Sequence, residues 1–231
     1  MTPMNQRAAS VAALVVGVVV VVLLAIAVST SISDPFDLAV IGIVRSEALR
    51  DPLAPLRWIT ELGSTGAVTV AAIITFVVGV LIGPWRHGLA GAVTIGLASV
   101  GNQLLKVTVA RTRPDLLEPI VVEHGFSFPS GHSALGTVAY GVLAILVMRS
   151  RLPLGARRAV VAALTILVLL IGLSRVWLGV HYPTDVLAGW TAGAVIVLLY
   201  AGLTRSASPE PAAAAVDADP AAPRSDRPGP G

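Results

Sequence analysis

The sequence of 231 residues contains no cysteine, and charged residues make up only 13% of it. Without cysteine, the chain can form neither a disulfide framework nor a thiolate metal site. A soluble domain carries about 25% charged residues, so this composition argues against an ordinary soluble enzyme. Hydrophobic residues make up 55% of the chain, which excludes disorder for most of it, because so apolar a sequence cannot stay solvated.

Lysine is almost absent, since Lys106 is accompanied by 15 arginines and no second lysine. The net charge is only +3, and the charges are scattered between apolar runs instead of forming a block. This pattern gives no indication of nucleic-acid binding.

Six stretches are long and apolar enough to cross a bilayer as helices of about 20 residues. They cover residues 8–33, 62–85, 88–106, 131–148, 158–175 and 185–204. The first is longer than the roughly 7–15 residues of a signal-peptide core, so we expect an uncleaved first helix. The sequence therefore predicts an all-α polytopic membrane protein, with residues 1–205 forming one six-transmembrane-helix bundle. Residues 206–231 lack apolar periodicity and predict a disordered tail.

The basic residues predict the orientation of the bundle. The loop between the fourth and fifth spans carries Arg149, Arg151, Arg157 and Arg158 and no acid, which is typical of a cytoplasmic loop. Both termini and the tail are then cytoplasmic, and the loops after spans one, three and five face outside the cell membrane. Prolines divide the first outer loop, residues 34–61, into pieces that could form short amphipathic helices.

Three polar clusters lie at the predicted outer ends of the spans. Inserting a charged side chain within a membrane helix costs about 2.5–3.5 kcal/mol of free energy, so each charged residue in these clusters calls for a structural or functional explanation. The first cluster holds Lys106 and Arg113, which are two helical turns apart and can share a face before Pro114 ends the helix. Snorkelling of two interfacial anchors would also explain this pair.

The second cluster is Pro129-Ser130-Gly131-His132, at the start of span four. Ser130 suits a helix N-cap, and Gly131 lets an anion approach the free backbone amides of the helix start. An ordinary capped helix start would explain Ser130 and Gly131. It would not explain a histidine in the first turn of a membrane span.

The third cluster joins spans five and six and holds Arg175, His181 and Asp185. A loop histidine and a first-turn acid would be ordinary features taken separately. Because His181 and Asp185 are four residues apart, however, Asp185 can hold one ring nitrogen and leave the other as an unprotonated nucleophile.

Together the clusters provide two histidines, one carboxylate, three cations and a helix N-terminus. Fixed cations and N–H donors are what a phosphoryl group requires during transfer. No pair of membrane acids suits magnesium, and two histidines beside three cations suit zinc poorly, so we expect no metal and no other cofactor.

These residues resemble the type-2 phosphatidic acid phosphatase superfamily. Its pattern is KxxxxxxRP, then PSGH, then SRxxxxxHxxxD, and every fixed position and internal spacing matches this chain. The three motifs begin here at Lys106, Pro129 and Ser174. The resemblance covers about residues 30–205 and leaves out the tail.

The resemblance implies a role for each matched residue. His181 would attack phosphorus and form a phosphohistidine, oriented by Asp185, and His132 would protonate the departing lipid oxygen and then activate water. The phosphate would be bound by five further matched residues, Lys106, Arg113, Ser130, Gly131 and Arg175. We expect a bell-shaped pH profile with an optimum on the acidic-to-neutral side.

The implied function is metal-independent hydrolysis of a phosphomonoester or diphosphate on a membrane lipid, at an outward-facing site of the plasma membrane. The substrate classes are isoprenyl diphosphates, phosphatidic acid and phosphatidylglycerol phosphate. Three alternatives use the same residues differently: a lipid phosphotransferase, a vanadate-dependent halide oxidase, and a non-enzymatic transporter or flippase. The partners expected are therefore the lipid substrate and the bilayer, and the oligomeric state is left open.

Overall fold

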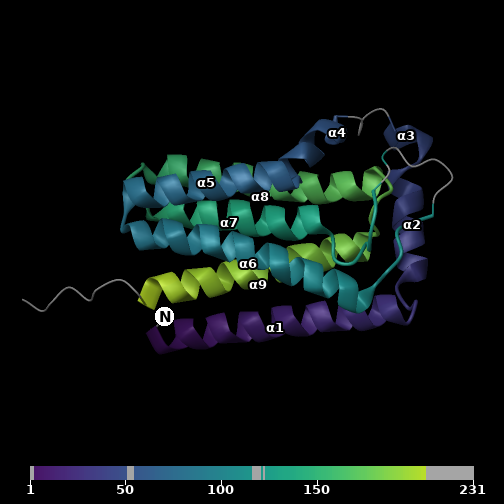
Figure 1. Cartoon of the computed structure of the whole chain (residues 1–231), viewed down its shortest axis with the longest axis horizontal. Helices are drawn as coiled ribbons and strands as arrows, with labels where there is room; N and C mark the ends of the chain where they lie inside the picture. Colours follow the sequence, from purple (N-terminus) through teal and green to yellow (C-terminus); the bar gives the residue numbers. More distant parts are fainter. Residues whose placement is uncertain (1–2, 51–54, 116–120, 122, 207–231) are drawn as a thin grey trace, which may run out of the picture.

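The long helices lie roughly side by side, and the short ones gather at one end of the bundle, as Figure 1 shows for the computed structural model. The structure describes residues 3–50, 55–115, 121 and 123–206, and within these parts of the chain no strand is present. The long helices are α1 (Pro3–Ser29), α5 (Thr65–Ile82), α6 (Trp85–Val109), α7 (Gly131–Arg149), α8 (Leu154–Trp177) and α9 (Pro183–Ser206). The short elements are α2 (Asp34–Val44), α3 (Glu47–Arg50), α4 (Leu56–Ile59) and the 3₁₀ helix η1 (Thr60–Gly63).

Each long helix is long and apolar enough to cross a membrane, which confirms the all-α, six-span prediction. The helix limits nevertheless differ from the predicted spans, because local capping sets them. α1 ends at Ser29 instead of residue 33, and the Thr30 hydroxyl donates a hydrogen bond back to the Ile26 carbonyl at 2.8 Å. α5 begins at residue 65 instead of 62, because Ser64 Oγ caps it by accepting the Ala67 N–H at 3.3 Å. The predicted tail lies outside the described residues beyond the end of α9.

Helix α7 forms the centre of the bundle and packs against α5, α6, α8 and α9. Its inner face is fully buried at Val138, Ala139 and Val142. Small residues let α9 approach it closely, since a Cβ on Gly189 would lie 2.7 Å from the Ser130 carbonyl oxygen. This close contact places the first turns of α7 and α9 side by side.

The two ends of the bundle differ in charge. We call the end formed by residues 30–50, 55–64, 110–115, 123–130 and 178–185 the histidine end, and α2 lies across it (Figure 1). The opposite end, formed by the turns at residues 83–84 and 150–153 and the C-terminus of α9, is the arginine end. The acids of the described residues all lie at the histidine end: Asp34, Asp37, Glu47, Glu61, Asp115, Glu123 and Asp185.

Candidate active site

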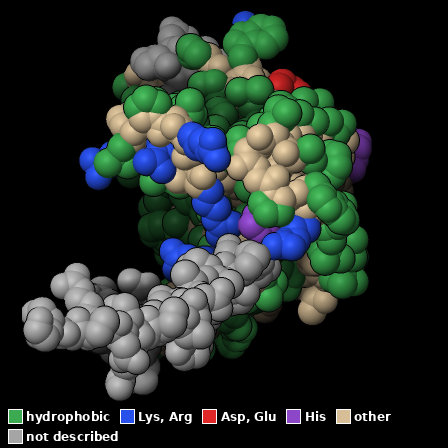
Figure 2. Space-filling model, turned by 90° about the vertical axis from the view of Figure 1, so that its left-hand side faces the viewer, with side chains coloured by type: hydrophobic (Ala, Val, Ile, Leu, Met, Phe, Trp, Pro, Cys, Tyr) green, Lys and Arg blue, Asp and Glu red, His purple; other side chains and the backbone are tan. Residues whose placement is uncertain are grey.

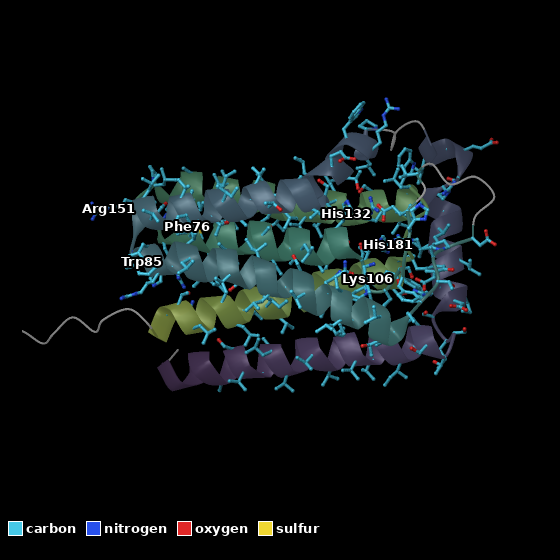
Figure 3. All side chains as sticks on the ribbon, in the orientation of Figure 1. Phe76, Trp85, Lys106, His132, Arg151 and His181 are labelled. Carbon is cyan, nitrogen blue, oxygen red and sulfur yellow. The ribbon has the colours of Figure 1, made fainter. Side chains whose placement is uncertain are left out.

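A cavity of about 580 Å³ opens at the histidine end of the bundle. Figure 3 shows Lys106, His132 and His181 at this end, far from Arg151. Five of the eight candidate residues line the cavity: Lys106, Arg113, Gly131, His132 and His181. Three motifs that are distant in the sequence therefore converge on one space.

The first motif reaches the cavity by a different route from the one its spacing predicts. Helix α6 ends at Val109, because Ala110 takes a left-handed conformation with φ 52°. Lys106 and Arg113 therefore do not share a helical face, and the prediction that Pro114 ends the helix is wrong. Arg113 lies in an extended segment, where its Nη1 donates to the Val180 carbonyl at 2.8 Å.

The second motif forms the first turn of α7. Ser130 occupies the N-cap position, as predicted, but its hydroxyl accepts a hydrogen bond from Ser133 Oγ at 3.1 Å instead of capping a backbone N–H. Ser130 is fully buried, and its N–H donates to the Asp185 carbonyl at 3.0 Å. A Cβ on Gly131 would lie 3.3 Å from Asn102 Nδ2, so the absent side chain keeps this helix start open to the cavity.

The third motif places an imidazole between an acid and a cation. His181 Nδ1 lies 3.4 Å from Asp185 Oδ2, as the four-residue spacing predicts, and its Nε2 lies 3.3 Å from Arg113 Nη1. A guanidinium can only donate, so Nε2 is the acceptor and Nδ1 carries the proton. Arg175, at the end of α8, is buried and donates to Thr60 Oγ1 at 2.8 Å.

Burial holds His181 in the neutral form. Desolvation lowers the pKa of this imidazole to about 4, and the charges of Arg175 and Arg113 act in the same direction against Asp185. Near neutral pH the ring therefore keeps a lone pair on Nε2, the nitrogen that lies beside Arg113.

This pKa predicts the acid limb of the pH profile. If neutral His181 is the nucleophile, kcat/KM should fall as the pH drops through about 4, because protonation removes the Nε2 lone pair. Asp185→Asn should move that limb to lower pH, since the carboxylate raises the pKa of His181. The measurement is kcat/KM from pH 3 to 7, with activity re-measured at pH 7 after each acid exposure to exclude unfolding. An acid limb that does not move in Asp185→Asn would contradict this assignment.

Glu123 lies outside the three motifs, which assign it no catalytic role. Its carboxylate pairs through Oε1 with Arg175 Nη2 and through Oε2 with Arg113 Nη2, the second at 3.2 Å. Although burial favours its neutral form, the charge of Arg175 lowers the pKa of Glu123 to about 2. An anion therefore already lies between two of the cations that the motifs assign to phosphate.

Removing that anion should strengthen phosphate binding. In Glu123→Gln the amide still bonds Arg175 but no longer neutralises it, so we expect inorganic phosphate to inhibit about tenfold more strongly, an effect of roughly 1.4 kcal/mol. The control is Glu47→Gln, which removes the same charge from an exposed position on α3. Equal inhibition constants in the two variants would show that Glu123 does not compete with phosphate.

Arg111 is the second residue that the motifs miss. Its guanidinium joins Asp185 Oδ1 at 2.7 Å to Asp37 Oδ2 at 2.7 Å, and it stacks 3.8 Å above the Tyr182 ring. Asp37 also accepts the Thr184 N–H at 2.9 Å, which ties α2 to the start of α9. The sequence around Asp37 does not predict this contact, because a single acid in a short amphipathic helix is usually solvated.

One wall of the cavity meets the surface of the bundle. Thr65 on α5 and Gln103 and Val107 on α6 line the cavity and are also exposed. Gly63 packs closely behind His132, since a Cβ there would lie 3.0 Å from the imidazole Cδ2. Within the described parts of the chain, no three His, Asp or Glu side chains form a group that could hold a metal ion.

Fold and site together define a multi-pass helical membrane protein with a cationic, histidine-bearing pocket at one end of its bundle. The chain belongs to the PAP2 superfamily, whose family model matches residues 87–207.

Several characterised proteins are similar to this chain. Phosphatidylglycerophosphatase B of Bacillus subtilis is 37% identical over 116 residues, which are 50% of this chain and 57% of that protein. Undecaprenyl-diphosphatase of Sulfolobus acidocaldarius is 32% identical over 123 residues, 49% of this chain and 53% of that protein. The chain thus spans about half the length of these curated relatives.

The fold has a counterpart among solved structures. The crystal structure of a transmembrane PAP2-type phosphatidylglycerolphosphate phosphatase from Bacillus subtilis superposes with a TM-score of 0.74 at 29% identity. The match covers 84% of this chain and 97% of that one, so it extends beyond the residues that the family model matches.

Proposed function

We propose that this protein hydrolyses a phosphomonoester or diphosphate on a membrane lipid. The observation that carries the proposal is the 580 Å³ cavity in which a neutral His181 faces Lys106 and Arg113 beside the start of α7. Phosphoryl transfer depends on positioning and on stabilising charge over the equatorial oxygens, and this arrangement supplies both. The names of the similar proteins, all lipid phosphatases, point the same way.

The first step uses both histidines. His181 Nε2 attacks phosphorus, the bond from phosphorus to the lipid oxygen breaks, and His132 gives its proton to that oxygen. Asp185 holds the Nδ1 proton of His181 and stabilises the charge that the ring gains.

The second step returns the site to its starting state. His132, now neutral, takes a proton from water, the water oxygen attacks phosphorus, and the bond from phosphorus to Nε2 breaks. The cations and the α7 amides bind the phosphate oxygens until the product dissociates. The residues proposed to bind these oxygens are Lys106, Arg113 and Gly131, which line the cavity, and Ser130 and Arg175, which are buried.

We place isoprenyl diphosphates and glycerophospholipid phosphates such as phosphatidylglycerol phosphate first among the substrates. Both classes carry a terminal phosphate on an apolar body, and the exposed wall of the cavity at Gln103 and Val107 allows such a body to stay in the bilayer. Relatives of this chain are named for both classes.

We also propose that both termini are cytoplasmic and that the cavity faces outside. The arginine end carries no acid among the described residues, and positive residues favour the cytoplasmic side.

The test is phosphate release by the purified protein in excess chelator, with a panel of phosphorylated lipids in mixed micelles. Release from at least one isoprenyl diphosphate or glycerophospholipid phosphate supports the proposal. An absolute requirement for magnesium would overturn the mechanism, and transfer of phosphate to an added alcohol in preference to water would identify a phosphotransferase.

A further inference from the structure

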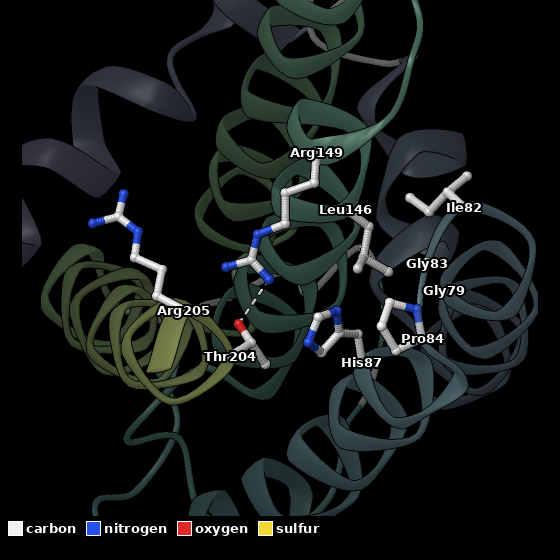
Figure 4. Close-up of a pocket in the computed structure, with 9 residues that line it drawn as sticks. All are labelled: Gly79, Ile82, Gly83, Pro84, His87, Leu146, Arg149, Thr204 and Arg205. Carbon is white, nitrogen blue, oxygen red and sulfur yellow. Dashed lines mark hydrogen bonds between the residues drawn. The ribbon is translucent and has the colours of Figure 1, made fainter. Parts of the chain in front are cut away.

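A second cavity, of about 350 Å³, lies at the arginine end of the bundle, opposite the candidate active site. Figure 4 shows that it is formed where the turn between α5 and α6 meets the ends of α7 and α9. Its polar side chains are His87, Arg149, Thr204 and Arg205, and its apolar ones include Ile82 and Leu146. None of these residues belongs to the three motifs.

Two of the polar groups are held in place. Arg149 Nη1 donates to Thr204 Oγ1 at 2.8 Å, and the Thr204 hydroxyl donates to the Tyr200 carbonyl at 2.7 Å. The Tyr200 hydroxyl in turn donates to the His87 carbonyl at 3.0 Å, so a chain of hydrogen bonds connects α6, α7 and α9 beside the cavity. In Figure 4 the guanidinium of Arg149 reaches toward Thr204 and lies on the same side as the His87 ring.

One polar atom of this cavity is not satisfied. His87 Nε2 is buried and has no hydrogen-bond partner among the described residues. A buried polar atom left without a partner costs about 1–3 kcal/mol. A ligand with hydrogen-bonding oxygens between His87 and Arg149 would remove that cost.

The charge of this end favours an anion. Figure 2 shows arginine side chains on this end, and the described residues there include six arginines and no acid. The six are Arg86, Arg149, Arg151, Arg157, Arg158 and Arg205. Arginine binds phosphate through a planar fork of donors, which a point charge cannot do.

The surroundings of the cavity favour a lipid over a free ion. Leu81 and Trp85 flank the turn that forms the cavity and are 77% and 62% exposed, and Ile82 in the lining is also exposed. Tryptophan beside arginine at the end of a spanning helix is typical of the level of the lipid headgroups. We propose that this pocket binds the phosphate of an anionic phospholipid, with the acyl chains against the exposed apolar side chains of the α5–α6 turn.

The experiment counts bound lipids by native mass spectrometry on the delipidated, full-length protein. Phosphatidylserine is the probe and phosphatidylcholine the neutral comparison, because neither carries a terminal phosphomonoester for the active site. We expect phosphatidylserine to bind the unaltered protein more tightly. Arg149→Gln should weaken that binding about tenfold or more, as expected for losing a charge-assisted contact.

Arg158→Gln is the matched control, since it removes the same charge from an exposed position at the same end, outside the cavity. If arginines at this end act only through their summed charge, the two variants will bind phosphatidylserine equally, and the proposal fails. Thr204→Val and His87→Ala test the same pocket if Arg149→Gln is poorly folded. Inorganic phosphate that displaces the lipid at equal concentration would show a free-anion site and overturn the lipid assignment.

This site is independent of the proposed catalysis. Its variants lie at the opposite end of the bundle from the cavity with the two histidines, so phosphate release in detergent should not change with Arg149→Gln. A protein that releases phosphate but binds no phosphatidylserine would therefore contradict only the lipid site. A protein that binds phosphatidylserine but releases no phosphate would contradict only the proposed function.

Discussion

Replacing His181 with alanine is expected to reduce lipid-phosphate hydrolysis on the order of 10⁴-fold or more, the scale seen when a nucleophile is removed from an enzyme. The imidazole is almost fully buried and contacts Asp185 through one ring nitrogen and Arg113 through the other. The loss should appear in kcat for every substrate, because the variant lacks the nitrogen that we propose attacks phosphorus.

Substrates with different leaving groups distinguish the roles proposed for the two histidines. The p-nitrophenolate group of p-nitrophenyl phosphate departs without a proton. In kcat/KM, which reports the first step and not the later attack of water, His132→Ala should therefore lose far less on this substrate than on an alkyl phosphate. His181→Ala should lose both equally. Equal losses in the two variants on both substrates, or residual activity near the unaltered level in His181→Ala, would contradict the assigned roles.

Replacing Arg111 with methionine is expected to destabilise the protein by about 3–5 kcal/mol, the cost of removing one partner from a buried ion pair. Both carboxylates that it bridges, Asp37 and Asp185, are fully buried. The pKa of Arg111 is raised despite the opposing effect of burial, chiefly by the charge of Asp185, which fits a guanidinium held between acids. The free energy of unfolding should be measured by denaturant titration in detergent micelles.

Two variants make this prediction specific. Arg57→Met removes an exposed arginine from α4 and should change stability by no more than about 0.5 kcal/mol. Adding Asp37→Asn to Arg111→Met should restore part of the loss, since one of the two unpaired charges is then gone. A double variant no more stable than Arg111→Met would mean that the Asp37 charge does not account for the loss.

The sequence could predict what depends on composition and on short spacing. Uninterrupted apolar runs located all six long helices, and the interval of four residues between His181 and Asp185 anticipated their contact. The position of Arg113 could not be obtained in this way, because a single left-handed residue, Ala110, turns the chain out of the helix before it.

The parts of the site that were missed depend on contacts between distant residues. Arg111 meets Asp37 and Asp185 across 74 positions in either direction, and Glu123 meets Arg175 across 52. Nothing in the local periodicity of a sequence encodes such pairs, which form only when the bundle brings its loops together. An acid between two presumed phosphate ligands also contradicts the simple expectation that a phosphate site excludes negative charge.

The buried bond from Asp37 to the start of α9 has a consequence for how a substrate arrives. Asp37 anchors α2 to the start of α9, away from the cavity lining, whereas Thr65, Gln103 and Val107 are exposed where the cavity meets the flank of α5 and α6. A lipid substrate would enter laterally from its own leaflet, and its tails would stay within the bilayer. Turnover should then depend on the packing and fluidity of that leaflet.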